Sequence, residues 1–337
     1  MEDSIAAIEN YISSEWDGGN AEIELVAEVV EPRGSEEDLE QITDMMGSYT
    51  TNYKDSGQNR CDNISNATSK INGTLLYPGE EFSVYEAIGP LDAANGYELA
   101  GAYENGQTVE SYGGGVCQVS TTLYNAVILA ELEITQRSNH SMIVSYVKPS
   151  MDAAIAGDYK DLRFVNNQDI PIYIEGYTEG KNVTFKIYGH DTRPSNRVVT
   201  YESEVVSEQD PGTQYVATGD PAGYMKTAQG KHIGYVARLW KVVTVDGVEE
   251  SREIFNKSTY KASPKIVNVG TASADPNVSA VIGAALATGD EATINAAVAP
   301  YAASAAAILN PAPVEQPSQE EQAITGTVDE SQITGGE

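Results

Sequence analysis

The 337-residue sequence contains only two cysteines, Cys61 and Cys117. Two cysteines are too few for a disulfide scaffold or a cysteine-rich zinc site, although they are compatible with a single disulfide. The three histidines, His140, His190 and His232, form no H-x-x-x-H pair, and the cysteines form no C-x-x-C pair. We therefore expect neither a metal centre nor a cofactor in this protein.

Positive charge is scarce, because 20 Lys and Arg residues face 50 Asp and Glu residues, for a net charge of −30. A chain of this charge repels polyanions, which excludes nucleic acids and anionic lipids as partners. The acidic excess fits the solvated surface of a secreted protein. No run of about 18 apolar residues is present, and Met1 is followed by Glu-Asp-Ser rather than by the segments of a signal peptide. We expect a soluble chain that lacks its export signal or membrane anchor.

The length suggests two or three domains, at roughly 100–200 residues per domain. Residues 1–50 combine helical spacing of apolar residues over Ser4–Trp16, strand alternation over Ala21–Val30 and a second helical pattern over Ser35–Met46. We interpret this segment as a small α+β lobe.

Residues 51–195 carry the pattern of a larger α+β domain. An apolar stripe over Gln118–Leu132 predicts a helix that is buried along one face. Strands are predicted at Ser141–Val147, Leu162–Val165, Ile170–Tyr177 and Asn182–Gly189, the last two as a hairpin. We expect this helix to pack on an antiparallel sheet.

Residues 196–272 show strand signals and no convincing helix, so we predict an all-β module. Its clearest feature is the turn Asp246-Gly247 between two strand patterns, which is a strong hairpin signal. Residues 273–337 are first Ala-rich and then rich in Pro, Gln, Glu and Gly. We predict a disordered tail there, with at most a transient helix over Glu291–Ile308.

The most distinctive stretch is the glycine run Gly113, Gly114 and Gly115, which leads into Cys117 at the start of the predicted central helix. Glycines allow positive φ values and a close approach of the backbone to a ligand. The first turn of a helix offers unpaired N–H groups and the positive end of the dipole, which lower the pKa of a thiol. Cys117 is therefore a candidate nucleophile, and the alternative is a small buried residue at a tight turn.

A cysteine nucleophile needs a base within hydrogen-bonding reach and a group that orients the base. His140 follows the predicted helix, where the chain can turn back toward Cys117, and Asp152 comes after the next predicted strand. Backbone N–H groups at the helix start would stabilise an oxyanion. The residues predicted to bind substrate or an oxyanion are Gly113, Gly114, Gly115, Gln118, Ser120 and Thr121.

The order Cys117, His140, Asp152 resembles that of the transglutaminase-like and papain-like hydrolases, in which the cysteine also begins a helix packed on a sheet. A closer resemblance is to the VanW family, which is associated with vancomycin resistance clusters of Gram-positive bacteria. The stretches that carry it are Gly113–Asn125, Arg137–Ser141, Tyr146–Val147, Asp152–Ala153, Asn59-Arg60, Pro78-Gly79-Glu80 and Ile88-Gly89-Pro90.

The resemblance covers about residues 48–193 and implies flanking parts. In such proteins this region commonly follows a peptidoglycan-binding lobe, which the N-terminal fifty residues resemble weakly. It is often followed by a G-five domain, which Val198–Thr271 resembles through Tyr260 and Pro264. Ser150-Met151 replaces the usual glycine-containing turn and Ala154 a common threonine, so Asp161 stays an alternative to Asp152.

The resemblance implies an extracellular protein at the cell surface or cell wall, whose partner is peptidoglycan or a cell-wall peptide. Two functions remain open. In the first, Cys117 makes the protein an acyl transferase or hydrolase that acts on peptidoglycan stem peptides or wall proteins. In the second, the protein binds the wall without catalysis, and His140 is an ordinary core histidine. The sequence gives no oligomeric state.

Overall fold

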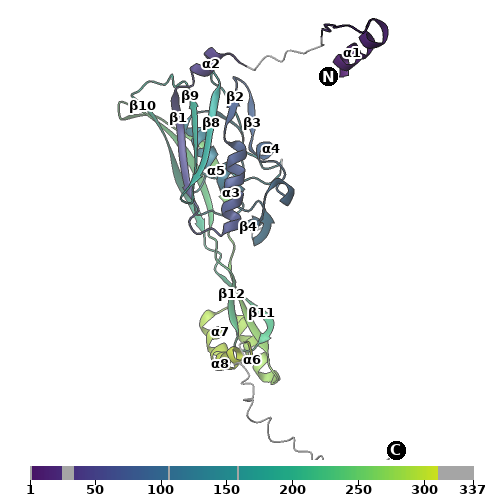
Figure 1. Ribbon diagram of the computed structural model, residues 1–337. Coiled ribbons are helices and arrows are strands. Elements are labelled where there is room, and N and C mark those ends of the chain that lie inside the picture. The colour runs from purple at the N-terminus through teal and green to yellow at the C-terminus, as the bar shows by residue number, and fades with distance from the viewer. Residues whose placement is uncertain (1, 25–33, 105–106, 158, 310–337) are drawn as a thin grey trace, which may run out of the picture. The chain divides into compact units, whose positions relative to one another are not determined.

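The computed structural model describes residues 2–24, 34–104, 107–157 and 159–309 (Figure 1). The chain forms two compact units. The first unit comprises Met1–Ser207 and Val236–Tyr260, and the second comprises Glu208–Tyr235 and Lys261–Glu337.

The first unit contains the helices of the N-terminal half and most of the strands. Its helices are α1 (Glu2–Ser14), α2 (Glu36–Glu40), α3 (Gln58–Ile71), α4 (Val84–Ile88), the short 3-10 helix η1 (Ala93–Asn95) and α5 (Val116–Leu129). Its first nine strands are β1 (Asp44–Asn52), β2 (Thr74–Leu76), β3 (Glu81–Ser83), β4 (Leu99–Glu104), β5 (Gln107–Tyr112), β6 (Glu133–Gln136), β7 (Arg163–Val165), β8 (Ile172–Glu179) and β9 (Asn182–Gly189).

The main sheet of this unit has the order β1-β9-β8-β2, and its neighbouring strands are antiparallel. Helices α3 and α5 pack on it, α3 against β8 and α5 against β1 and β9. A smaller antiparallel sheet has the order β3-β7-β6, and β4 pairs with β5. The predicted α+β class with antiparallel sheets is confirmed, as is the hairpin of β8 and β9.

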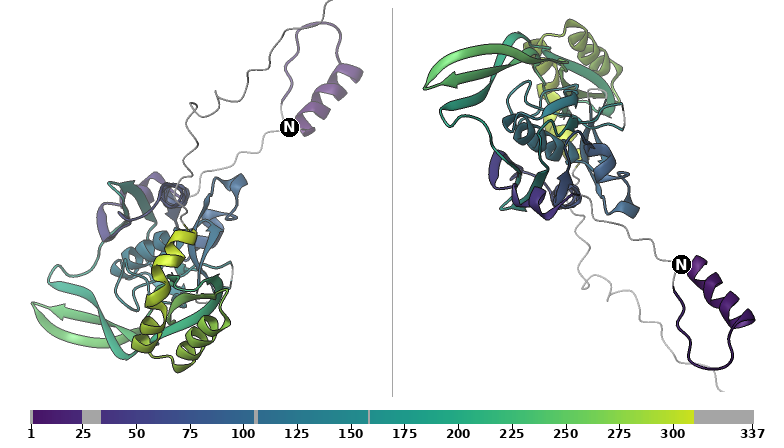
Figure 2. Two further views of the ribbon diagram at one scale, coloured as in Figure 1. Left: turned by 90° about the horizontal axis from the view of Figure 1, so that it is seen from below. Right: turned by 90° about the horizontal axis from the view of Figure 1, so that it is seen from above.

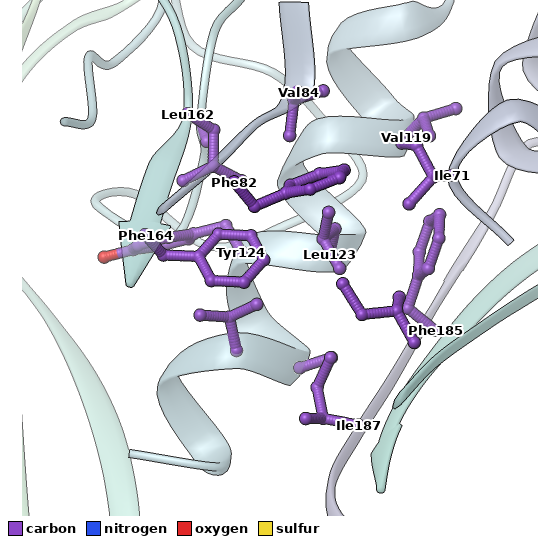
Figure 3. Packing of buried hydrophobic residues seen from close by; sticks show 14 of the residues in the cluster. Ile71, Phe82, Val84, Val119, Leu123, Tyr124, Leu162, Phe164, Phe185 and Ile187 are labelled. Carbon is purple, nitrogen blue, oxygen red and sulfur yellow. The ribbon is translucent and has the colours of Figure 1, made fainter. Parts of the chain in front are cut away.

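Helix α5 runs through the middle of the hydrophobic core (Figure 3). Every residue of α5 except Cys117 and Leu129 is buried, because the helix is covered on nearly all sides. Leu123 points into a cluster that includes Phe82 and Phe185 (Figure 3). The position of Cys117 at the start of α5 is therefore fixed by the best-packed element of the unit.

A three-stranded sheet from later in the chain completes the first unit. Its order is β10-β13-β14, formed by β10 (Arg197–Gln209), β13 (Gly234–Val245) and β14 (Val248–Tyr260). The fully buried Leu239 of β13 joins the core around α5. The Tyr201 hydroxyl of β10 donates to the carbonyl of Ile128 at 2.9 Å. The predicted hairpin turn is present, with positive φ at Asp246 and Gly247.

Ion pairs also join this sheet to the end of α5. Arg197 and Lys241 contact the Glu131 carboxylate at 2.5 and 2.7 Å. Burial raises the pKa of Glu131, but the hydrogen bonds and charges of these two cations outweigh it and hold the pKa at about 2. Glu131 therefore stays ionised, and the β10-β13-β14 sheet is bound to α5 by polar as well as apolar contacts.

The second unit combines a small sheet with three helices (Figure 1, Figure 2). The sheet has the order β11-β15-β12 and consists of β11 (Thr213–Pro221), β12 (Met225–Gln229) and β15 (Lys265–Ala272), with β11 parallel to β15. The helical elements are α6 (Pro276–Thr288), α7 (Glu291–Val298), the 3-10 helix η2 (Ala299–Tyr301) and α8 (Ala302–Leu309).

The tail predicted from residue 273 is folded over residues 276–309: α6 was not predicted, and the stretch Glu291–Ile308, for which only a transient helix was expected, forms α7, η2 and α8. Ile282, Ile294 and Val298 of the helices are buried in one cluster with Val267 and Val269 of β15. The Ala-rich composition is thus typical of helices here, because alanine favours the helix and only a few large side chains are needed to bury one face. By length and composition the stretch Glu291–Leu309 is apolar enough to cross a membrane, but it is divided between α7, η2 and α8.

Of three further predictions, one is mostly untested and two differ from the structure. Residues 25–33 lie outside the described residues, so most of the predicted strand Ala21–Val30 is not tested. The helix predicted over Ser35–Met46 ends at Glu40, and β1 then joins the main sheet by pairing with β9, so the lobe of residues 1–50 does not end at residue 50. Residues 141–147, which were predicted to form a strand, form none, although Met142 and Val144 are buried.

The closest approach of α5 to the sheet is at Gly47 of β1, and it gives a stability prediction. A Cβ atom at Gly47 would lie 2.3 Å from the carbonyl oxygen of Ala126. We expect Gly47→Ala to lower the free energy of unfolding by about 1–3 kcal/mol, because the helix has to move away. Chemical denaturation measures this change, with Gly57→Ala as control, since a Cβ there meets open space. Equal losses in both variants would contradict the packing described here.

Candidate functional site

The glycine run shapes the backbone that enters α5. Gly115 is the N-cap of the helix and has φ 116°, and Gly113 has φ 75°, so both lie in the left-handed region that favours glycine. A Cβ at Gly114 would lie 2.6 Å from the carbonyl oxygen of Ala100. The run therefore allows a tight turn under β4, which places Cys117 in the first turn of α5.

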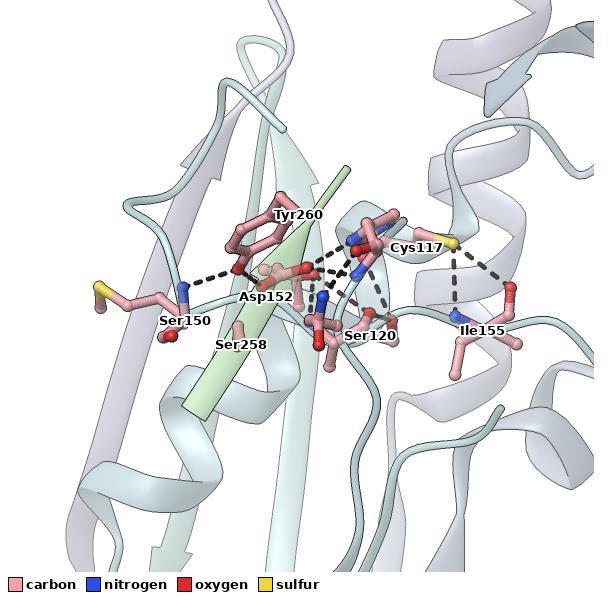
Figure 4. Close-up of polar contacts among 12 residues, drawn as sticks. Cys117, Ser120, Ser150, Asp152, Ile155, Ser258 and Tyr260 are labelled. Atoms are coloured by element: carbon pink, nitrogen blue, oxygen red, sulfur yellow. Dashed lines mark hydrogen bonds and ion pairs between the residues drawn. The ribbon is translucent and has the colours of Figure 1, made fainter. Parts of the chain in front are cut away.

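The thiol of Cys117 lies against the segment that follows Asp152 (Figure 4). The backbone N–H of Ile155 donates to Sγ at 3.4 Å, and Sγ lies 3.5 Å from the carbonyl oxygen of the same residue. Cys117 is partly exposed, whereas its neighbours in the helix are buried. The residue thus lies at the edge of the core, where its sulfur is covered on one side by the Ile155 backbone.

His140 lies between Cys117 and Asp152. Its ring Nδ1 is 2.7 Å from Asp152 Oδ2, and its backbone N–H donates to the same oxygen at 2.7 Å. On its other side the imidazole is within hydrogen-bonding reach of the Cys117 thiol. The Tyr146 ring packs edge-on against the imidazole, with 6.5 Å between ring centroids. The structure therefore brings together the three residues predicted to form the catalytic site.

The pKa shifts at this site favour a thiolate and an imidazolium. Burial lowers the pKa of His140, but its hydrogen bonds to Asp152 and Cys117 outweigh burial and raise the pKa to about 9. Burial raises the pKa of Cys117, but the hydrogen bond and charge of His140 and the Ile155 N–H bring it below its usual value. Burial likewise raises the Asp152 pKa, and His140 and Arg137 reverse that effect.

The second oxygen of the Asp152 carboxylate is held by two residues that the sequence did not assign to the site. Arg137 Nη2 donates to Oδ1 at 3.0 Å, and the hydroxyl of Tyr260 donates to the same oxygen. Arg137 Nη1 also donates to Ser258 Oγ at 2.9 Å. Arg137 lies in the stretch Arg137–Ser141 that carried the family resemblance, so its closeness to His140 in the sequence was a usable signal. Tyr260 gave no such signal, because it lies more than a hundred residues from Asp152 in the sequence.

Asp161, the alternative to Asp152, does not contact His140. Its carboxylate accepts hydrogen bonds from Ser83 Oγ at 2.6 Å and from the backbone N–H of Tyr85 at 2.9 Å. Asp161 therefore stabilises the corner between β3 and α4. The structure assigns the contact with His140 to Asp152.

The side chains of Gln118, Ser120 and Thr121 do not line an open surface, which corrects the prediction that they bind substrate. All three are buried. Gln118 Nε2 donates to Thr51 Oγ1 and its Oε1 accepts from Arg60, both within 3.0 Å. The hydroxyls of Ser120 and Thr121 both donate to the carbonyl of Ala153. These side chains hold the backbone around the site in place.

The backbone N–H of Gln118, predicted to stabilise an oxyanion, donates instead to the carbonyl of Gly115 at 2.9 Å. The N–H of Cys117 remains in the first turn, where the helix offers it no carbonyl. Any oxyanion stabilisation from α5 therefore comes from that N–H and from the helix dipole.

The described residues contain no group of three or more His, Cys, Asp and Glu side chains placed to hold a metal ion. Cys61 and Cys117 are both free thiols. An open hollow of about 440 Å³ lies on the Arg137 side of the site, with Tyr124, Phe255 and Asn256 among its lining residues.

Comparisons with known proteins match two families in this chain. Residues 59–188 match the VanW-like proteins, and residues 200–272 match the G5 domain. The Bacillus subtilis (strain 168) protein YoaR, named as uncharacterized, is 34% identical over 187 residues, which cover 55% of this chain and 62% of YoaR. The vancomycin B-type resistance protein VanW of Enterococcus faecalis (strain ATCC 700802 / V583) is 30% identical over 118 residues, 33% of this chain and 42% of that protein.

Two solved structures are similar to the β-rich region. The IgA1 protease G5 domain structure is 24% identical, has a TM-score of 0.16 and covers 23% of this chain and 94% of its own. The structure of HP0197-G5 is 19% identical, has a TM-score of 0.13 and covers 21% of this chain and 97% of its own. The chain spans less than two thirds of the length of both curated relatives.

Ser150, in the turn before Asp152, gives a second stability prediction. Its φ is 67°, its side chain is fully buried, and its hydroxyl has no hydrogen-bond partner. We expect Ser150→Gly to raise the free energy of unfolding by about 1 kcal/mol, because glycine relieves the left-handed strain. Ser150→Ala is the matched control, since it removes the hydroxyl and keeps the strain. A Gly variant no more stable than the Ala variant in chemical denaturation would contradict this reading.

The pKa shifts predict how the reactivity of Cys117 depends on pH. Below about pH 9 the imidazolium of His140 stabilises the Cys117 thiolate, so we expect Cys117 to react with iodoacetamide at neutral pH. We expect a second change in the alkylation rate near pH 9, where the imidazolium loses its proton. Cys61 is the internal control within the same chain. Peptide mass mapping over pH 5–10 measures both rates. Identical profiles for the two cysteines would show that the pair does not form.

Proposed function

Because the chain contains a VanW-like domain followed by a G5 domain, we propose that it works outside the cell, at the wall of Gram-positive bacteria, as a cysteine-dependent acyl transferase or hydrolase. The acyl donor is an amide in a peptidoglycan stem peptide or a wall protein. The observation that carries this proposal is the grouping of three side chains: Cys117 at the start of α5, His140 beside it, and Asp152, whose Oδ2 lies 2.7 Å from Nδ1 of His140. Its order resembles that of transglutaminase-like and papain-like hydrolases.

In the first step the Cys117 thiolate attacks the carbonyl carbon of the donor amide, and a carbon–sulfur bond forms. The carbonyl oxygen becomes an oxyanion next to the Cys117 N–H and the positive end of the α5 dipole. The His140 imidazolium then donates its proton to the leaving nitrogen, and the carbon–nitrogen bond breaks. The products are an amine and a thioester on Cys117.

In the second step the neutral His140 accepts a proton from water or from an acceptor amine, which attacks the thioester carbon. The carbon–sulfur bond breaks and the thiolate and imidazolium are restored. Water as acceptor makes the protein a hydrolase, and an amine makes it a transferase. Asp152 holds Nδ1 of the imidazole throughout, which keeps the other ring nitrogen directed at Cys117.

A specific observation also favours the alternative, a wall-binding protein without catalysis. The Cys117 sulfur already contacts both the N–H and the carbonyl of Ile155, so the backbone partly encloses it. In that case the hollow beside Arg137 and the G5 domain supply the binding surfaces, and the buried polar cluster serves stability alone.

Trapping of the acyl-enzyme tests the catalytic proposal. Wild-type protein is incubated with soluble stem peptides, and intact-mass spectrometry detects a thioester adduct and released products. We expect Cys117→Ala to lower product formation by at least about 1000-fold, since the nucleophile is lost. Cys61→Ala is the matched control and is expected to keep full activity.

The same variants separate the two functions. If Cys117→Ala releases product as fast as wild type, the catalytic proposal fails. If neither variant nor wild type yields product and all three sediment equally with purified peptidoglycan, the protein binds the wall without catalysis.

A further inference from the structure

We propose that Tyr260, at the end of the G5 strand β14, is a positioning residue for the Cys117–His140–Asp152 site. The inference rests on the proposed function, because it concerns the same site. It adds that the VanW-like region is chemically incomplete without the strand that follows it.

The first observation is the place of the Tyr260 hydroxyl (Figure 4). It donates to Asp152 Oδ1 and accepts the backbone N–H of Ser150 at 2.7 Å. Tyr260 is 2% exposed, so water does not compete for these bonds. A single hydroxyl thus fixes both the carboxylate and the strained turn that leads into it.

The second observation is how the hydrogen bonds to Asp152 are distributed. Oδ2 accepts two bonds from His140, and Oδ1 accepts one from Arg137 and one from Tyr260. A fully buried carboxylate has no water to replace a lost donor. Removal of the Tyr260 hydroxyl therefore leaves Oδ1 with Arg137 alone and frees the carboxylate to rotate toward it, away from the imidazole.

The third observation is that β14 contributes a second contact. Ser258 lies two residues before Tyr260, so both side chains are on the same face of the strand. Its hydroxyl accepts from Arg137 Nη1 at 2.9 Å, while the same guanidinium binds the carboxylate and carbonyl oxygens of Asp152. The strand thus holds Asp152 directly through Tyr260 and indirectly through Arg137.

Neither Tyr260 nor Ser258 lies in the residues matched to the VanW-like proteins, which end at residue 188. Both lie in the residues matched to the G5 domain. Cys117, His140 and Asp152 therefore lie in one matched region and Tyr260 in the other, although all four belong to the first structural unit. Tyr260 is the residue through which the second matched region acts on the site.

The pH profile of Cys117 alkylation in the full chain tests this role. In Tyr260→Phe we expect the iodoacetamide rate of Cys117 at pH 7 to fall about tenfold, with the midpoint of thiolate formation at higher pH, because His140 loses its oriented carboxylate. Tyr201→Phe is the matched control. It removes another hydroxyl that joins this sheet to α5, at Ile128, and is expected to leave the profile unchanged.

The outcomes distinguish this inference from the proposed function. If wild-type Cys117 reacts no faster than Cys61, both are overturned. If wild-type Cys117 is activated but Tyr260→Phe and Tyr201→Phe share its profile, only the role of Tyr260 is overturned.

Should Tyr260→Phe fail to fold by circular dichroism, Ser258→Ala decides, because it keeps the tyrosine and removes only the acceptor of Arg137. A shift of the midpoint to higher pH in Ser258→Ala supports the role of β14. An unchanged profile overturns it.

Discussion

The charge of Asp152 is the constraint on which the rest of the site depends. A fully buried carboxylate is tolerated only when it is paired and hydrogen-bonded, and loss of one partner of such a pair costs about 3–5 kcal/mol. Its four donors come from Arg137, His140 and Tyr260. The segment after β6 and the last strand of the first unit must therefore fold together, because neither alone satisfies the carboxylate.

The burial of α5 fixes the position of Cys117. A helix enclosed on nearly all sides does not shift, so the thiol at its first turn is held within hydrogen-bonding reach of the imidazole. The same enclosure leaves no room for the polar side chains of α5 to face a ligand. They bind the backbone of Ala153 and Asn52 instead, so the helix positions the loop that carries Asp152 as firmly as it positions Cys117.

Much of the site could be predicted from the sequence, because its signals are local. A glycine run, a cysteine at a helix start and a histidine after that helix lie within a short stretch, and their spacing is what a Cys-His pair requires. Tyr260 could not be assigned in this way, since its contact with Asp152 spans 108 positions and depends on the packing of a whole sheet. The roles of Gln118, Ser120 and Thr121 were wrong because periodicity shows one buried stripe and cannot show that the other faces are covered too.

The fold could be predicted where the apolar residues repeat regularly over a long stretch. It was missed where the Ala-rich composition suggested disorder. The hairpins and the central helix follow from alternation and spacing. Helix α6 was missed and only a transient helix was expected over α7 and α8, although Asp275 and Asp290 cap helix starts and Gly289 ends α6, which are recognisable sequence signals. The strand predicted over residues 141–147 is absent, although Met142 and Val144 of that segment are buried.

The interleaving of the two matched regions bears on how this protein is divided for experiments. A recombinant fragment cut at residues 59–188 would lose β1 from the edge of the main sheet and the three strands that cover α5. It would expose the apolar surface around Leu123 and Tyr124, remove the cations that face Glu131 and leave Asp152 without Tyr260. If such a fragment were inactive or insoluble, the cause would be the missing strands, and the result would not test the chemistry of Cys117. A fragment that preserves the site must include β1 through Tyr260, and it must also keep β15, because β11 and β12 both pair with that strand.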